Sequence, residues 1–319
     1  MTPKKLLVIS LSLLIVSGVL FNLLINSHQE LFYEKYTRVA TSKDPTYAME
    51  LLAKDIKKWP ELVNVCHAIA HEIGHVSYKK YGFQNSLTKF EDDICGSGFM
   101  HGVTEEYIAN SKSPLKDMLS VCPEGYGACF HGIGHGLLLY YENDLPEAIA
   151  GCNLFKNSTE IVQCSEGVFM QNFNTDTISH KNNFINPKNT LYPCSTQELI
   201  HKSACYFYSP RYFVKLHPKK YLEALENCQN AETQFIGQCI KGVGSVTMKE
   251  NIDEPSVSEA VCKKAPEDYR NQCYSGMTSY YIIHIGSLEK ARILCTSIDA
   301  DFKNTCLETV ANSANFFVD

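Results

Sequence analysis

Histidines at helical spacing are the residues of this sequence best suited to chemistry. His71 and His75 are four residues apart in "HEIGH", and His131 and His135 are four apart in "HGIGH". Residues four apart lie on one face of an α-helix, so each pair presents two imidazoles side by side. Neutral imidazole is the commonest metal-ligand side chain, and the two pairs together predict a site for one or two transition-metal ions.

Some of these histidines are expected to meet across neighbouring helices. His101 and His135 each follow a cysteine by six residues, Cys95 and Cys129. A repeat built on these cysteines places the two histidines at equivalent positions of stacked helices, on one polar and concave face that could also receive a peptide or protein. The same position elsewhere holds Glu72, Met170, Arg211, Ser245, Ser279 and Asn312. The predicted metal ligands are His71, His75, His101, His131 and His135.

The pentapeptide at 71–75 also matches HExxH, in which two histidines one turn apart bind zinc and the glutamate activates a water molecule. It resembles the zincin metallopeptidases. The resemblance implies that Glu72 is the general base and that a third ligand, such as Glu105 or Glu106, leaves one coordination position open for water. If the protein is an enzyme, it is then a zinc-dependent hydrolase.

Other features of the sequence keep alternatives open. Tyr78 and Tyr81 stand where the metzincin pattern continues with glycine and histidine, and Gly132 replaces the glutamate in the second motif. Copper is an alternative to zinc, because Met100 and Met170 are expected beside the histidines and thioether sulfur is a copper ligand. Buried, hydrogen-bonded histidines in a metal-free interaction scaffold are the remaining interpretation.

The cysteines predict the framework that must position these histidines. There are 14, an even number, none before Cys66 and none in a C-x-x-C pair, which indicates disulfides formed in an oxidising compartment. Four pairs have ten intervening residues and begin 34, 34 and 33 residues apart, a period typical of helical hairpins. The predicted pairs are Cys122–Cys129, Cys152–Cys164, Cys194–Cys205, Cys228–Cys239, Cys262–Cys273, Cys295–Cys306 and, by elimination, Cys66–Cys95.

Glycine recurs three residues after the second cysteine of a pair. Because glycine inside a helix costs about 1 kcal/mol, its recurrence predicts a close approach of neighbouring helices. These glycines are Gly98, Gly132, Gly167, Gly242 and Gly276. The period and the paired cysteines of residues 60–319 resemble cysteine-rich Sel1-like or TPR-like repeats, although the TPR pattern of Trp, Gly, Tyr and Pro is absent. The resemblance implies an α-solenoid.

The N-terminus predicts the location of the protein. Residues 6–25 form an uncharged apolar run after two lysines, long enough for a transmembrane helix, with a cleaved signal peptide as the alternative. The rest of the chain is then extracytoplasmic.

A net charge of −6, with positive and negative residues interspersed, argues against nucleic-acid binding. We expect an all-α chain of disulfide-stapled helical-hairpin repeats: 1–26 anchor or signal, 27–60 stalk and lead-in helix, 61–173 His-rich repeats, 174–193 polar insertion loop, 194–319 Cys-paired repeats.

Overall fold

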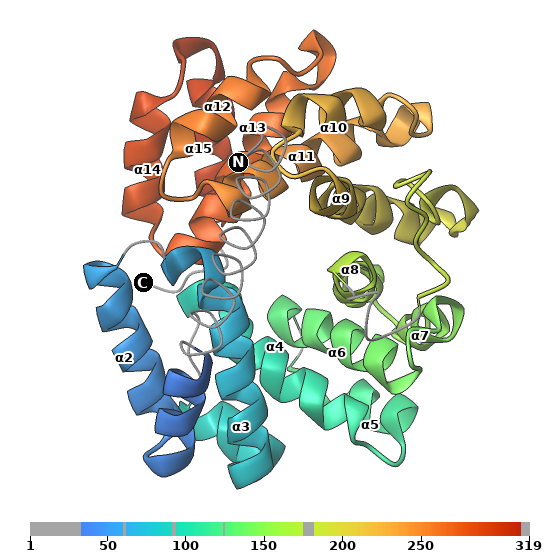
Figure 1. Cartoon of the computed structure of the whole chain (residues 1–319). Coiled ribbons are helices and arrows are strands. Elements are labelled where there is room, and N and C mark those ends of the chain that lie inside the picture. Colours follow the sequence, from blue (N-terminus) through green and yellow to red (C-terminus); the bar gives the residue numbers. More distant parts are fainter. Residues whose placement is uncertain (1–32, 60–61, 91–93, 124, 175–181, 314–319) are drawn as a thin grey trace, which may run out of the picture.

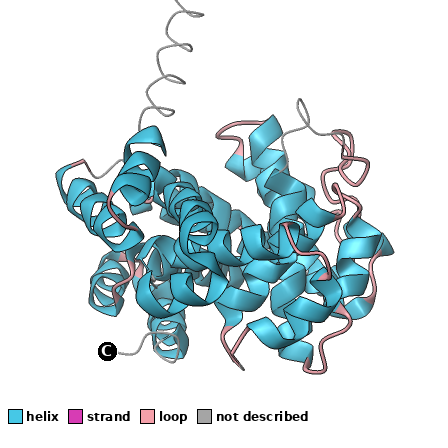
Figure 2. Ribbon diagram, turned by 90° about the horizontal axis from the view of Figure 1, so that it is seen from below, coloured by secondary structure: helices cyan, strands magenta, loops and turns pink. Residues whose placement is uncertain are grey.

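The computed structural model describes residues 33–59, 62–90, 94–123, 125–174 and 182–313. This part of the chain consists of helices joined by turns and loops, with no β-strand (Figure 2). The all-α class predicted from the sequence is therefore confirmed. Residues 6–25, which were predicted to cross a membrane, lie outside the described residues. Within the described ranges, no helix combines the length and the hydropathy that a membrane span requires.

The long helices form a ring in which each packs on the next. The ring closes because α13 also contacts α4 and α3 (Figure 1). In chain order the ring helices are α3 (Val63–Phe90), α4 (Ile94–Ala109), α6 (Gly127–Tyr140), α8 (Ser158–Asn174), α9 (Leu199–Leu216), α11 (Ile236–Glu250) and α13 (Arg270–Ile285). The face that the repeat pattern predicted to be concave thus becomes the interior of a closed ring.

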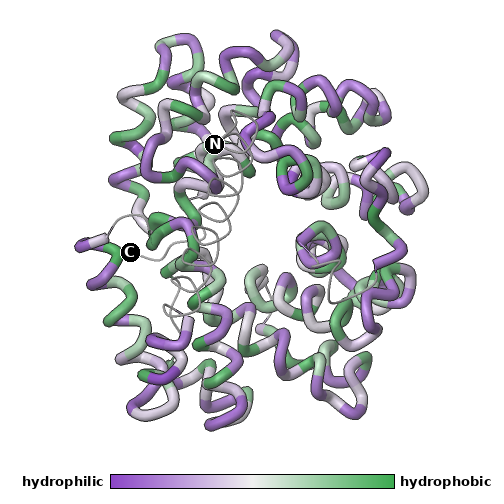
Figure 3. Tube along the Cα trace, viewed as in Figure 1, coloured by the Kyte–Doolittle hydropathy of each residue, from purple (hydrophilic) through white to green (hydrophobic). Residues whose placement is uncertain are grey.

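Shorter helices cover the outside of the ring. They are α5 (Pro114–Val121), α7 (Leu145–Cys152), α10 (Tyr221–Cys228), α12 (Pro255–Cys262) and α14 (Leu288–Ser297), with α15 (Lys303–Ser313) packed on α13 and α14. Single 3-10 turns are η2 (Cys194–Thr196), η3 (Thr233–Phe235), η4 (Glu267–Tyr269) and η5 (Ala300–Phe302). The lead-in region contains helical residues 33–42 and α2 (Pro45–Lys58), whose apolar residues pack on α3. Hydrophobic and hydrophilic residues alternate along most helices, as expected when one side is buried (Figure 3).

The seven cysteine pairs predicted from the sequence are confirmed. Their Cα–Cα distances are 5.3 to 5.7 Å, within the range that a disulfide bridges. Most of them tie the end of an outer helix to the first turns of the next ring helix. Cys194 differs, because it follows the insertion loop and lies in η2 instead of an outer helix. Cys66–Cys95 also differs, because it joins the first turn of α3 to the first turn of α4. The other disulfides hold a helix to the segment that precedes it.

The glycines that follow the second cysteines lie where ring helices touch. A Cβ atom added to Gly167 would lie 1.9 Å from the carbonyl oxygen of His131, and one added to Gly276 would lie 1.9 Å from that of Lys241. Equivalent close approaches occur at Gly98, Gly132 and Gly242. The predicted close approach is confirmed: a side chain at these positions would force neighbouring helices apart.

The polar insertion begins where α8 ends at Asn174, and residues 182–193 are irregular. These residues are attached to the ring. The side-chain amide of Asn172 donates to the Phe184 carbonyl at 3.2 Å, and that of Asn182 donates to the Asn172 carbonyl at 3.1 Å. Phe184 packs against the main hydrophobic core. The insertion thus takes the place of an outer helix between α8 and α9.

Candidate metal centre

Seven histidines from four ring helices meet in the interior. The centroids of the His67 and His71 rings are 4.8 Å apart, and His101 stacks on His131 at 4.8 Å. The full group is His67, His71 and His75 of α3, His101 of α4, His131 and His135 of α6, and His284 of α13. All five histidines predicted as ligands belong to it. The structure also brings in His67 and His284.

One group of ligand atoms joins the HExxH histidines to a carboxylate of the next helix. Nδ1 of His71 lies 3.3 Å from Oε2 of Glu105, and Nε2 of His75 lies 3.4 Å from Oε1 of Glu105. The three ligand atoms all lie within 4.8 Å of one another. Two ligands of a tetrahedral zinc ion, bonded at about 2.0 to 2.2 Å, are about 3.3 to 3.6 Å apart. Each observed separation has about the length of such an edge, and the two end on different oxygens of the Glu105 carboxylate.

Charge within this group is strongly coupled. Burial by itself lowers the pKa of His75. The carboxylates of Glu105 and Glu72 outweigh this effect and raise the pKa above its usual value, to about 10. Burial raises the pKa of Glu105, and the imidazoles of His71 and His75 hold it well below its usual range. Nε2 of His75 is nevertheless buried without a hydrogen bond of good geometry. Glu105 therefore faces positive charge, which a proton or a metal ion could supply.

The predicted base, Glu72, lies on the other side of the His75 ring. Its Oε2 is 3.8 Å from Nδ1 of His75, and its side chain is 48% exposed. Oε2 of Glu106 is also 3.8 Å from that nitrogen, and Glu106 pairs with Lys79 at 3.0 Å. Carboxylates on the far nitrogen of a metal-binding histidine orient its ring. This arrangement favours an orienting role for Glu72.

The remaining histidines of the cluster are neutral because they are buried. Burial, followed by the charge of neighbouring imidazoles, holds the pKa values of His67 and His101 well below the usual range. Burial lowers the pKa of His135 to about 4. Nδ1 of His101 and Nε2 of His135 are buried without a hydrogen-bond partner. Neutral imidazoles with unused nitrogens are the form that binds metal ions.

The two methionines of the copper hypothesis differ in position. Sδ of Met170 lies 3.3 Å from Nε2 of His131, beside the cluster as the sequence predicted. Met100 is buried, and its sulfur accepts a hydrogen bond from Thr104 at 3.6 Å. Met170 therefore places a thioether sulfur beside His131, where it could act as a copper ligand.

Cationic side chains lie beside the histidine cluster. Arg211 of α9 is 9% exposed, and its guanidinium carbon lies 4.8 Å from the centroid of the Tyr208 ring. Burial and then the charge of Arg211 lower the pKa of Lys249 to about 8. No carboxylate of the described residues lies within ion-pair distance of either side chain. Besides burial, the charge of Arg211 lowers the pKa values of His131, His135 and His284, so the cationic side chains border the imidazole cluster.

The fold and this cluster define a class of protein: a disulfide-stapled, all-helical ring with histidines gathered in its interior. The chain matches no protein-family model, and no curated protein or solved structure is significantly similar to it. The resemblances to Sel1-like repeats and to zincins therefore stay predictions, and the functional argument depends on the geometry of the cluster.

Proposed function

We propose that this protein binds a transition-metal ion in the interior of the ring, at His71, His75 and Glu105. The observation that carries the proposal is the pair of 3.3 and 3.4 Å separations between Glu105 and the two imidazoles. Two nitrogens and one carboxylate oxygen form a donor set typical of zinc sites that keep one position open. Zinc is therefore the ion that we expect at this group.

A metal-free interpretation competes with this one. A protonated His75 could pair with Glu105, and the ring would then be a scaffold for a peptide or protein partner. The ion pair accounts for the charge of His75 but leaves its Nε2 without a well-formed hydrogen bond. It also leaves unexplained why neutral imidazoles, among them His101 and His135, gather beside it with unused nitrogens. A metal ion at His71, His75 and Glu105 would occupy Nε2 of His75, and the neighbouring neutral imidazoles offer further nitrogens to metal ions.

Location is part of the proposal. Seven disulfides fit an oxidising compartment, where such bonds form and persist. We propose that the ring faces the extracytoplasmic side, held at the membrane by the apolar run at 6–25, which lies outside the described residues.

Elemental analysis tests metal binding. The disulfide-intact protein is loaded with zinc, freed of excess ion and compared with Glu105→Gln and His71→Ala. We expect at least one equivalent of zinc in the wild type and a loss in both variants. His217→Gln is the control, because His217 is exposed at the end of α9. A wild type that retains no zinc after loading would contradict the proposal.

Zinc-dependent hydrolysis is the second candidate function. It is favoured by Glu105, which gives HExxH the third ligand found in metallopeptidases. Glu72 and Glu106 provide a matched test, because each lies 3.8 Å from Nδ1 of His75. If Glu72 is the general base, Glu72→Gln alone abolishes turnover in a peptidase screen and still binds zinc. If both residues only orient His75, Glu72→Gln and Glu106→Gln lower zinc affinity to a similar extent and neither abolishes turnover selectively.

A further inference from the structure

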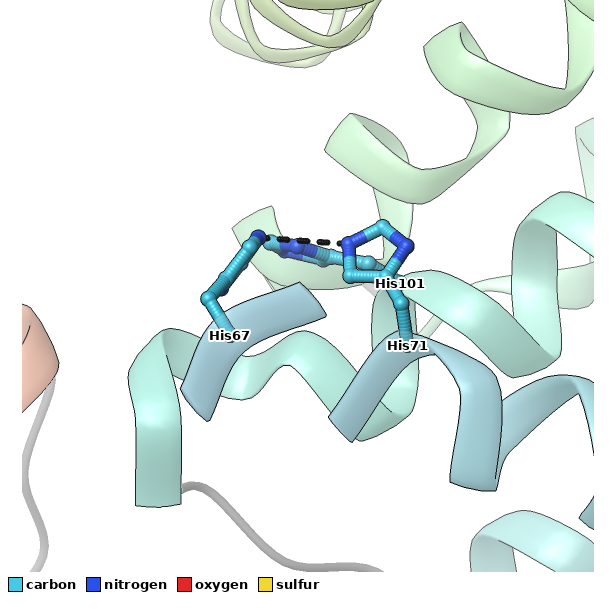
Figure 4. A group of neighbouring side chains, drawn as sticks. All are labelled: His67, His71 and His101. Carbon is cyan, nitrogen blue, oxygen red and sulfur yellow. Dashed lines mark hydrogen bonds between the residues drawn. The ribbon is translucent and has the colours of Figure 1, made fainter. Parts of the chain in front are cut away.

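His71 stands between two groups of ligand atoms and faces each with a different nitrogen. Its Nδ1 lies 3.3 Å from Glu105, whereas its Nε2 lies 3.2 Å from Nε2 of His67. The second group consists of His67, His71 and His101, whose ligand atoms also lie within 4.8 Å of one another. Figure 4 shows these three imidazoles converging from α3 and α4. The shared ring is the link between the groups.

The hydrogen bonds of His67 determine which of its nitrogens is free. Its Nδ1 is 2.7 Å from the carbonyl oxygen of Cys95. Because a carbonyl can only accept, Nδ1 carries the hydrogen and Nε2 holds a lone pair directed at His71. The carbonyl is presented by a left-handed turn with φ of 60° at Cys95, 67° at Gly96 and 56° at Ser97. Non-glycine residues in this region cost about 1 to 2 kcal/mol each, so the turn is a strained feature beside the cluster.

Two further imidazoles border the second group. His101 is 7% exposed, its Nδ1 has no hydrogen-bond partner, and its ring centroid lies 5.3 Å from that of His67 and 5.4 Å from that of His71. His284 donates from Nδ1 to the Tyr280 carbonyl at 3.0 Å, which leaves a lone pair on Nε2. The centroid of its ring lies 5.4 Å from that of His67. Four imidazoles thus surround one small region.

We propose a second transition-metal site, formed by His67, His71 and His101 and bordered by His284, with His71 bridging it to the first site. The inference depends on the proposed function, because His71 belongs to both sites. When both ions are bound, each nitrogen of His71 holds one ion and the ring proton is released to water. The 3.2 Å between Nε2 of His67 and Nε2 of His71 is within about 0.2 Å of the edge expected for two imidazole ligands on one ion.

The second site explains why a histidine of the last repeats reaches the first. His284 lies on α13, and the three ligands that it borders lie on α3 and α4, the helices at which the ring closes. An ion held there would lie between the two ends of the ring, with Nε2 of His284 beside it. Because a metal ion stabilises only the state in which its ligands are assembled, its binding favours the closed ring.

Elemental analysis of the zinc-loaded full chain separates the two sites. We expect two equivalents in the wild type and in the control His217→Gln. His67→Gln is expected to retain one equivalent at the first site, and Glu105→Gln one at the second. Circular dichroism of each variant checks that it is folded. One equivalent in the wild type, retained in His67→Gln and lost in Glu105→Gln, overturns this inference and leaves the proposed function intact. No bound zinc in any form overturns both.

Loading with Cu²⁺ tests the bridge itself. Two copper ions that share one imidazolate are magnetically coupled, so the electron paramagnetic resonance signal of the doubly loaded wild type is expected to be broadened or lost. The signal returns in His67→Gln and in Glu105→Gln, which hold one ion each. Two equivalents of copper with an uncoupled signal would show that His71 does not bridge them and would overturn the inference.

Discussion

Gly102 lies where the two helices that carry the first site touch. A Cβ atom added there would lie 2.1 Å from the carbonyl oxygen of His71 and 2.9 Å from its Cα. Carbon and oxygen approach to about 3.3 Å at closest, so Gly102→Ala must separate α3 from α4 by more than 1 Å. Glu105 follows on α4, and the two histidines of the proposed first site lie on α3. The substitution therefore moves the carboxylate away from the imidazoles.

Two effects of different size follow from this shift. Metal–ligand distances tolerate only about 0.2 Å, so zinc affinity is expected to fall at least tenfold, or about 1.4 kcal/mol. Overpacking costs about 1 to 3 kcal/mol of folding stability, and the higher helix propensity of alanine offsets about 1 kcal/mol. The metal-free variant is thus expected to lose up to about 2 kcal/mol of folding stability.

Two other glycines provide matched controls. A Cβ atom on Gly242 would lie 2.1 Å from the Phe207 carbonyl oxygen, between α9 and α11, where no predicted ligand lies. A Cβ atom on Gly237 would meet side chains instead of backbone, the Tyr269 ring at 3.3 Å and Cγ of Gln272 at 3.4 Å. Guanidinium denaturation of the metal-free proteins and zinc titration against a chelator measure both effects. We expect Gly242→Ala to lose stability and bind zinc normally, and Gly237→Ala to change neither. The reasoning fails if Gly102→Ala binds zinc as tightly as Gly242→Ala.

Three further predictions concern the framework. Burial raises the pKa of Asp55, but hydrogen bonds, first from Lys35, lower it below its usual value. A carboxyl group whose pKa is lowered in the folded state stabilises the fold above pH ~4, and this contribution is lost as the pH falls. As the pH falls below ~4, the free energy of unfolding measured with urea should therefore decrease more in the wild type than in Asp55→Asn. Replacing Cys295 and Cys306 by alanine opens a short loop and should cost about 3 kcal/mol; unchanged thermal unfolding would argue against this. Ser287 accepts a hydrogen bond at the start of α14, and Ser287→Ala should cost about 1 kcal/mol, measured by the same denaturation against Ser287→Thr.

Much of the framework was predictable because it depends on residues close together in the chain. Pairs such as Cys228 and Cys239 bracket a single turn between two helices, so spacing alone identified them. The helix contacts at Gly167 and Gly276 were indicated by their recurrence in register with the cysteines. The membrane segment at 6–25 stays a prediction. These local signals determined that the chain forms stapled helical hairpins.

The site was predictable in part for the same reason. His71 and His75 share a helix face by their spacing, and His101 stacks beside His135 because equivalent positions of successive repeats are neighbours. Glu105 was one of two carboxylates that the zincin pattern left open. The structure favours it over Glu106, because Glu105 faces Nε2 of His75 while Glu106 lies beside Nδ1.

The sequence by itself determined the helices, their disulfides and a histidine-rich face. Only the tertiary structure decided that this face is enclosed and that His284 joins His67 within it. The curvature of a repeat array is the sum of small rotations between successive units, and no single unit records that sum. Whether the last ring helix, α13, meets the first two, α3 and α4, therefore depends on packing along the whole ring. Here the packing closes the ring at α13, and residues remote in sequence share one centre.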